Sequence, residues 1–158
     1  MLVACSQQTK VEVPEHVEGP TLALSQIDTL MWHHPDSALA VMMEFAGSPE
    51  ADSLNEFEGH YCQVLVAELL FKNYYAQSNR AEVLMAVGYF DSIVGMNGAD
   101  ARGASPQRGV SVRERDAFLA ARAHYINGAG YYEHDSLIEA CQEYLNTLRM
   151  MESHFCRG

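Results

Sequence analysis

Histidine, cysteine and carboxylate side chains are the residues of this chain that could bind a metal ion or transfer protons. Seven histidines are present, and His33 and His34 are adjacent in a segment that reads as a helix end. Neighbouring side chains on a helix point about 100° apart, so these two cannot share a metal ion with good geometry. The HExxH pattern, with two histidines four residues apart, does not occur. The sequence therefore predicts no metal site.

A catalytic nucleophile is not indicated either. Cys62 lies two residues after His60, and residues two apart on a helix face away from each other. The segment Gly103–Pro106 does not form the G-x-S-x-G elbow of hydrolases. The glycines between residues 95 and 109 are not followed by the Gly-Lys-Ser or Gly-Lys-Thr of a phosphate-binding loop. We therefore expect no enzymatic activity and no cofactor.

Cys5 closes the run Leu2-Val3-Ala4-Cys5, which resembles the lipobox of bacterial lipoproteins. In those proteins the cysteine is lipidated and becomes the first residue of the mature chain. The basic and long apolar regions that precede such a cysteine are not in the sequence, so either a longer leader precedes Met1 or the four residues match by chance. Residues 1–19 are predicted to be a lipobox remnant and a flexible tether, with acyl chains on Cys5 holding the protein at the outer membrane.

The charge balance argues against binding to nucleic acid. Lys and Arg number 10 and Asp and Glu number 21, giving a net charge of -11 that repels phosphate backbones and anionic membranes. The apolar stretch 64–71 is interrupted by Glu68 and falls far short of the roughly 20 residues of a membrane-spanning helix. With 48% hydrophobic residues, residues 20–158 are predicted to form one globular domain that contacts a membrane only through a lipid anchor.

Apolar residues recur at intervals of three and four from Thr21 onward, which is the period of amphipathic helices. No segment alternates as a half-buried strand does. We therefore predict an all-α fold of six helices packed as antiparallel hairpins. They are expected to cover about residues 20–32, 35–46, 53–75, 80–94, 112–132 and 137–155.

Four of the predicted helix starts carry a capping box, in which an Ncap side chain and a glutamate three residues later satisfy two backbone donors. The pairs are Ser53 with Glu56, Asn79 with Glu82, Ser111 with Glu114, and Ser136 with Glu139. Between the fourth and fifth helices, residues 95–110 are rich in glycine and small side chains, which predicts a loop between two hairpins.

The last two predicted helices carry the spacing of a tetratricopeptide repeat, in which small residues let two antiparallel helices pack closely. The residues that match this spacing are Gly128, Tyr131, Ala140 and Tyr144. The match is partial, because His124 and Asn127 stand where the family usually has Trp and Leu. In the fourth predicted helix, Ala86 and Phe90 match the small and aromatic positions in the second helix of such a repeat, but this match is weaker.

Together with the run at Cys5, the segments His34–Leu39 and Lys72–Tyr74 and the Ala-His-Tyr-x-Asn-Gly helix, these features resemble tetratricopeptide-containing lipoproteins of Bacteroides and its relatives. The resemblance covers nearly the whole chain. It implies about three antiparallel hairpins stacked as a short right-handed superhelix. It also implies an envelope-anchored scaffold for protein–protein interaction that binds a peptide or protein partner on its concave face.

The fifth predicted helix supplies the candidate partner-binding residues, which are not assigned to the core and are expected to point into that face. They are Arg115, Arg122, His124 and Asn127. Replacing Arg122 and Asn127 by Ala is expected to weaken partner binding without lowering the melting temperature. Two other functions stay open: glycan capture by Trp32 or Tyr74-Tyr75, as in surface lipoproteins of glycan-foraging bacteria, and a sensor fragment of a longer regulator.

Several side chains are expected in the interior. Cys62 and Cys141 read as small buried helix residues, and aromatic residues at helical spacing such as Tyr125 and Tyr132 read as core. No polar capping helix follows the sixth helix in the sequence, so we expect either that the native protein continues beyond Gly158 or that the sixth helix mediates a homodimer.

Overall fold

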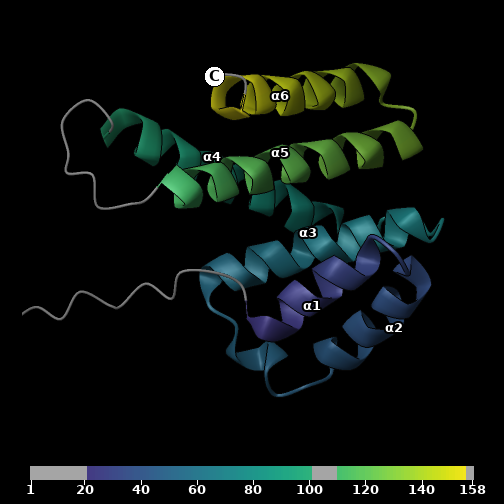
Figure 1. Ribbon diagram of the computed structural model, residues 1–158. Helices are drawn as coiled ribbons and strands as arrows, with labels where there is room; N and C mark the ends of the chain where they lie inside the picture. The colour runs from purple at the N-terminus through teal and green to yellow at the C-terminus, as the bar shows by residue number, and fades with distance from the viewer. Residues whose placement is uncertain (1–20, 101–109, 156–158) are drawn as a thin grey trace, which may run out of the picture.

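The computed structural model describes residues 21–100 and 110–155, with side chains placed for residues 21–95 and 114–152. Within these ranges the chain forms helices joined by short turns and contains no strand, and the predicted all-α class is confirmed (Figure 1). The α-helices are α1 (Leu22–Met31), α2 (Pro35–Ala46), α3 (Glu56–Lys72), α4 (Arg80–Asp100), α5 (Val110–Glu133) and α6 (Leu137–Phe155). A short 3₁₀ helix, η1 (Ala51–Ser53), precedes α3. Cys5 and the predicted tether lie outside the described residues.

Consecutive helices pack against each other, α1 with α2, α3 with α4, and α5 with α6. α1 and α2 lie on one side of α3, and α5 and α6 lie on the other (Figure 1). α5 packs not only against α6 but also against α4 and α3. The last helix pair is thereby joined to the middle one through α5.

Alanine lets α5 pack on several sides at once. Its buried apolar residues are Ala117, Leu119, Ala120, Ala121, Ala123, Ile126 and Ala129. A helix that other helices enclose has no single apolar stripe, and its small side chains allow its neighbours to approach closely. The core continues through Leu65 of α3 and Phe90 of α4, which are fully buried. None of the described helices is both long and apolar enough to span a membrane.

The start of α3 differs from the prediction. The Asn55 side chain accepts a hydrogen bond from Glu58 N at 3.0 Å, and Glu58 Oε2 accepts one from Asn55 N at 3.1 Å. This capping box replaces the predicted pair of Ser53 and Glu56, which is wrong because Ser53 belongs to η1 and Glu56 is the first residue of α3. A capping box is present at the start of α3, but Asn55 and Glu58 form it instead of Ser53 and Glu56.

Two further predicted capping boxes are also corrected. The Asn79 side-chain amide donates to the Gln63 backbone carbonyl at 2.9 Å and to Gln63 Oε1 at 3.0 Å, so it ties α4 to α3 instead of capping α4. Ser111 lies inside α5, which begins at Val110. Ser136 does precede the first residue of α6.

The boundaries near the predicted loop and the end of α3 also move. α4 continues through Gly95 to Asp100, so only part of the predicted loop 95–110 is non-helical, and residues 101–109 lie outside the described ranges. α3 ends at Lys72 because Tyr74 adopts a left-handed φ of 61°. Tyr75 N then donates to Leu70 O at 2.9 Å, the hydrogen bond of a Schellman helix end.

Candidate functional site

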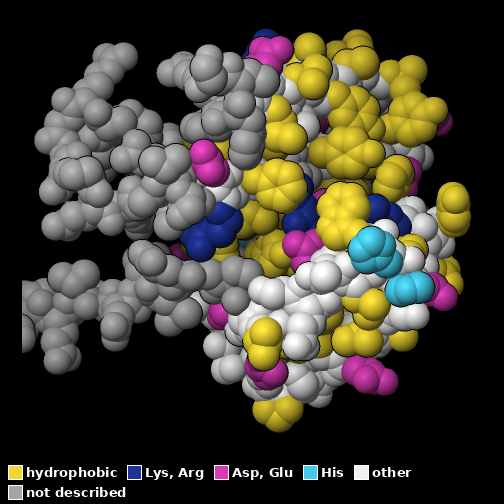
Figure 2. Space-filling model, in the orientation of Figure 1, with side chains coloured by type: hydrophobic (Ala, Val, Ile, Leu, Met, Phe, Trp, Pro, Cys, Tyr) yellow, Lys and Arg dark blue, Asp and Glu magenta, His cyan; other side chains and the backbone are white. Residues whose placement is uncertain are grey.

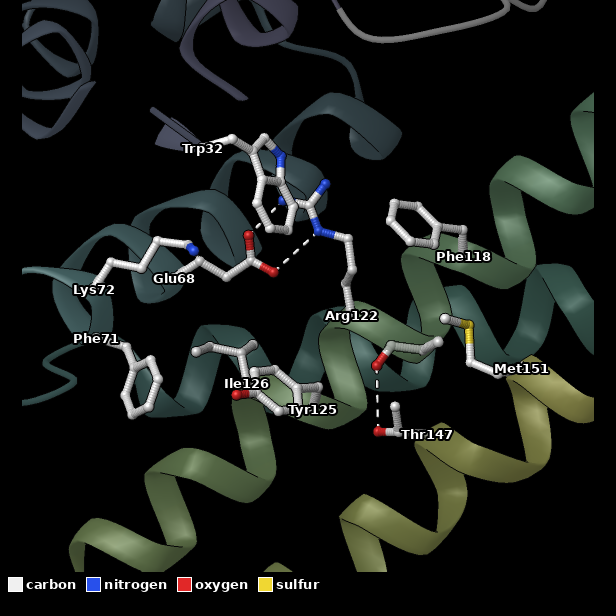
Figure 3. Close-up of a pocket in the computed structure, with 11 residues that line it drawn as sticks. Trp32, Glu68, Phe71, Lys72, Phe118, Arg122, Tyr125, Ile126, Thr147 and Met151 are labelled. Carbon is white, nitrogen blue, oxygen red and sulfur yellow. Dashed lines mark hydrogen bonds and ion pairs between the residues drawn. The ribbon is translucent and has the colours of Figure 1, made fainter. Parts of the chain in front are cut away.

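A cavity of about 350 Å³ opens between α3, α5 and α6, beside the end of α1 (Figure 3). This is within the size range of pockets that bind small ligands or single side chains of a partner. Its walls come from helices far apart in the sequence, and they carry mostly apolar side chains. The lining residues are Trp32, Glu68, Phe71, Lys72, Phe118, Ala121, Arg122, Tyr125, Ile126, Thr147 and Met151.

Five large apolar side chains of the lining are also exposed at its rim. The exposed fraction is 60% for Trp32, 45% for Tyr125, and 38% for each of Phe71, Phe118 and Met151. On the face seen in Figure 2, apolar side chains gather in the middle, with basic and acidic groups beside them. A single exposed apolar residue needs no explanation, but five around one cavity are typical of a binding surface.

One wall of the cavity is an ion-pair network around Arg122 (Figure 3). Arg122 Nε donates to Glu68 Oε1 at 3.0 Å, and its Nη1 and Nη2 donate to the two carboxylate oxygens of Asp28, each at 2.9 Å. Arg122 Nη2 also donates to Glu68 Oε2, and the Tyr61 hydroxyl donates to Asp28 Oδ2 at 2.5 Å. Because Asp28, Glu68 and Arg122 belong to α1, α3 and α5, the network joins the first helix of each pair.

The pKa shifts in this network agree with its geometry. Burial alone would lower the pKa of Arg122, but hydrogen bonds and charges from Glu68 and Asp28 outweigh burial and raise it above its ordinary value. Burial, followed by the hydrogen bond to Asp28, raises the pKa of Tyr61. At neutral pH Arg122 is therefore a cation, and Tyr61 is a protonated donor.

The polar groups of the lining are largely engaged with one another. The Thr147 hydroxyl lies within hydrogen-bond distance of the carbonyls of Ala121, at 3.3 Å, and Glu143, at 3.1 Å. Lys72 Nζ lies 4.5 Å from the centre of the Trp32 ring, and the Arg122 guanidinium lies 5.6 Å from that of Phe118. Since Glu68, Arg122 and Thr147 already have hydrogen-bond partners, the cavity is suited to an apolar group more than to a strongly hydrogen-bonding one.

Of the four predicted partner-binding residues, only Arg122 lines the cavity, and it is buried rather than open to solvent. Arg115 is partly exposed; it pairs with Asp116 at 3.0 Å and lies over the Phe57 ring. Asn127 is buried, and its side-chain nitrogen has no hydrogen-bond partner among the described residues. The expectation that Arg122, His124 and Asn127 lie outside the core is therefore wrong.

His124 is buried and forms a separate ion-pair cluster that joins α4, α5 and α6. Its Nδ1 lies 2.5 Å from Glu143 Oε2, and its Nε2 lies 3.0 Å from Asp91 Oδ1. Two carboxylates on opposite ring nitrogens favour the doubly protonated imidazolium, which donates from both. Burial lowers the pKa of His124, but the hydrogen bonds and charges of Asp91 and Glu143 outweigh burial, so the net shift is upward.

The residues of the tetratricopeptide spacing lie between the packed helices. A Cβ atom on Gly128 would lie 2.8 Å from Tyr144 Cε1, so α5 and α6 meet there at a distance that only glycine allows. Ala140 is buried, and Tyr131 is half-buried beneath the Arg80 guanidinium, which lies 5.0 Å from the ring centre. In the middle helix pair, Ala86 and Phe90 are both fully buried.

This close approach makes Gly128 sensitive to substitution. We expect Gly128→Leu to lower the free energy of unfolding by about 1–3 kcal/mol, because the added side chain must displace the Tyr144 ring. Gly88→Leu is the matched control, since a Cβ on this α4 glycine would meet nothing within 4 Å. Urea denaturation of both variants measures the difference, and equal stabilities would contradict close packing at Gly128.

Some residues expected in the core lie on the surface instead. Cys62 is buried, as expected, and burial raises the pKa of its thiol. Cys141 is exposed on α6, and Tyr125 and Tyr132 are exposed on α5. Periodicity identified the helices on which these residues lie but not which face of each helix was covered, since that depends on the neighbouring helices.

The cavity itself was not predicted from the sequence. Phe118, Arg122 and Tyr125 follow each other at intervals of four and three, the spacing of one helix face, and Thr147 and Met151 share a face of α6 in the same way. This spacing is the signal that could have grouped them. It could not have placed them opposite Phe71 and Trp32, because helix periodicity contains no information on contacts between distant helices.

Among the described residues, no group of three or more His, Cys, Asp or Glu side chains is arranged to hold a metal ion. Comparison of the chain with protein-family models, curated proteins and solved structures finds no match.

Proposed function

We propose that this chain is a tetratricopeptide-like scaffold that binds an apolar segment of a protein partner in the cavity between α3, α5 and α6. The observation that carries the proposal is the ring of exposed Trp32, Phe71, Phe118, Tyr125 and Met151 around a cavity of about 350 Å³. Aromatic and methionine side chains of this kind are enriched at protein interfaces.

Two features support the tetratricopeptide-like arrangement of three stacked hairpins. The first is the close approach of α5 and α6 at Gly128 and Tyr144. The second is the network of Asp28, Glu68 and Arg122, which lies on α1, α3 and α5. In a stack of helical hairpins, the first helix of each hairpin lines the concave face. A binding site beside this network is where such a scaffold would hold its partner.

The chemistry of the lining favours an apolar peptide segment over a glycan. Sugars bind through stacking on aromatic rings together with hydrogen bonds to several hydroxyls. Trp32 and Tyr125 could supply stacking, but the charged groups of Glu68 and Arg122 are committed to each other, and Lys72 lies over Trp32. The net charge of -11 further favours a partner whose apolar segment is flanked by Lys or Arg.

Trp32 is the only tryptophan of the chain and lines the cavity, so its fluorescence reports occupancy. Peptides of about 12 residues, selected on the folded protein from a random displayed library, should shift Trp32 emission on binding. We expect Phe118→Ala and Tyr125→Ala to weaken peptide affinity by about 10-fold or more, because each removes a rim contact.

Tyr74→Ala is the matched control, since Tyr74 is almost fully exposed and does not line the cavity. It should leave the affinity unchanged. The proposal would be contradicted if the selected peptides bound Phe118→Ala, Tyr125→Ala and the parent chain with the same affinity. Selective binding of oligosaccharides with the same emission shift would favour glycan capture instead.

Envelope localisation through lipid on Cys5 is a separate part of the proposal and rests on the run Leu2-Val3-Ala4-Cys5. A lipid anchor would place the scaffold at a membrane surface without any spanning helix. Radiolabelled palmitate supplied to cells that make the native protein should label it, and Cys5→Ser should abolish the label. Labelling that persists in Cys5→Ser would contradict this part alone.

A further inference from the structure

Met151 is the one methionine, among the side chains that the structure describes, that both lines the cavity and is exposed. Its exposed fraction is 38%. Met31 and Met42 are buried in the core, whereas Met43 and Met85 are exposed but do not line the cavity. Figure 3 shows the Met151 side chain reaching from α6 toward α5. This side chain is therefore open to small molecules in solution and lies within the proposed binding site.

The thioether of methionine is a soft group that peroxides oxidise. A lone pair of the sulfur attacks one peroxide oxygen, a sulfur–oxygen bond forms, and the oxygen–oxygen bond breaks. With hydrogen peroxide the products are methionine sulfoxide and one water molecule, so the sulfur is oxidised and the peroxide is reduced. The oxidant must reach the sulfur, which the exposure of Met151 allows and the burial of Met31 and Met42 prevents. Reductases return the sulfoxide to the thioether, so the change is reversible.

The hydrogen-bonding groups of the lining on α5 and α6 are already engaged. The Thr147 hydroxyl, one helical turn before Met151, lies within hydrogen-bond distance of two backbone carbonyls. Arg122 donates four hydrogen bonds to Asp28 and Glu68. In the free protein, water solvates a sulfoxide oxygen at residue 151. An apolar group that fills the cavity displaces this water, so the sulfoxide oxygen loses its hydrogen bonds and binding becomes weaker.

We propose that Met151 is a peroxide-sensitive modification site whose oxidation weakens the binding of an apolar partner segment in the cavity. This inference rests on the proposed function, because it concerns the regulation of the same site. The thioether contributes an apolar contact to a bound partner, whereas the sulfoxide is a polar group that must be desolvated on binding. Oxidation of Met151 should therefore weaken the affinity about tenfold.

The test compares the affinity of the selected peptides, followed by Trp32 emission, before and after treatment of the full chain with hydrogen peroxide. Mass spectrometry of tryptic fragments locates each oxidised methionine. The parent chain should lose affinity about tenfold, and methionine sulfoxide reductases should restore it. These enzymes do not reduce oxidised cysteine, so restoration separates Met151 from Cys141, which is also exposed on α6.

Two variants assign the effect to one residue, each compared with its own untreated sample. Met151→Leu should show no change in affinity after peroxide treatment. Met43→Leu is the matched control, because Met43 is an exposed methionine on α2 outside the cavity, and this variant should lose affinity as the parent chain does. Saturating peptide should also slow the oxidation of Met151 and leave that of Met43 unchanged, because the peptide covers only Met151.

The outcomes separate this inference from the proposed function. Complete oxidation of Met151 with unchanged peptide affinity would overturn the inference and leave the proposed function intact. An equal loss of affinity in peroxide-treated Met151→Leu would also overturn it. So would a loss of helix content in far-ultraviolet circular dichroism, since oxidation would then act through unfolding. An untreated parent chain that binds no selected peptide would contradict the proposed function, and the inference would fail with it.

Discussion

Replacing Arg122 by Met lowers the free energy of unfolding by about 3–5 kcal/mol, because it leaves two carboxylates near each other without their cation. Arg122 is buried and forms four hydrogen bonds, two to Asp28 and two to Glu68. Methionine nearly preserves the volume of the side chain, so the loss reflects charge more than a cavity. Urea denaturation at pH 7 measures this loss of stability. For the same reason Arg122→Ala should lower the melting temperature, contrary to the expectation from the sequence.

Two controls separate this effect from a general loss of packing. Adding Asp28→Asn and Glu68→Gln to Arg122→Met should recover much of the lost stability, since no uncompensated charge then remains. Arg149→Met changes an exposed arginine on α6 and should alter stability by no more than about 0.5 kcal/mol. A loss below about 1 kcal/mol in Arg122→Met would mean that the network does not hold α1, α3 and α5 together.

Stability of the protein should fall as pH rises above 6.5, the ordinary pKa of histidine, and His124 should account for most of the fall. Hydrogen bonds and charges from Asp91 and Glu143 outweigh burial and raise the pKa of His124 above its ordinary value of 6.5. A group whose pKa is raised by folding stabilises the folded state. This contribution is complete at pH values below the pKa of the group in the unfolded chain, and it is lost as the pH rises through the pKa of the group in the folded protein. The melting temperature should therefore decrease across that window.

His124→Gln should remove this pH dependence and lower stability at pH 6 by about 2 kcal/mol. This expected loss of stability lies in the middle of the range for buried hydrogen bonds. The reason is that the Asp91 side chain is 41% exposed, so water screens part of its interaction with the His124 ring. His134→Gln is the matched control, since His134 is exposed in the turn before α6. Equal slopes of melting temperature against pH in the parent chain and His124→Gln would contradict a charged His124.

Much of the fold was predictable because it depends on local patterns. Six helices follow from apolar periodicity, and the sixth begins at Leu137 as predicted. The errors lie at helix ends, where a hydrogen bond to a distant residue overrides a local signal, as for the Asn79 amide, which is drawn to Gln63. Likewise α4 extends through Gly95, although the glycine-rich composition there favours a loop.

The candidate site was less predictable because its parts come from distant segments. Arg122 lies 94 residues from Asp28 and 54 from Glu68 in the sequence, so no local pattern indicates that the three pair. A lone arginine on a helix usually faces solvent, which is why Arg122 reads as a surface residue in the sequence. Gly128 was predictable to a greater degree, because its spacing from Tyr144 reflects contact within one helical hairpin.

The location of a bound apolar peptide tests the central claim most directly. The chain has four isoleucines, Ile27, Ile93, Ile126 and Ile138, and their δ1-methyl groups can be followed by nuclear magnetic resonance during titration with a selected peptide. We expect the largest shift at Ile126, which lines the cavity, and none at Ile138 on the outer face of α6. An unchanged Ile126 methyl under saturating peptide, with shifts at Ile27 or Ile138, would contradict binding in the cavity between α3, α5 and α6.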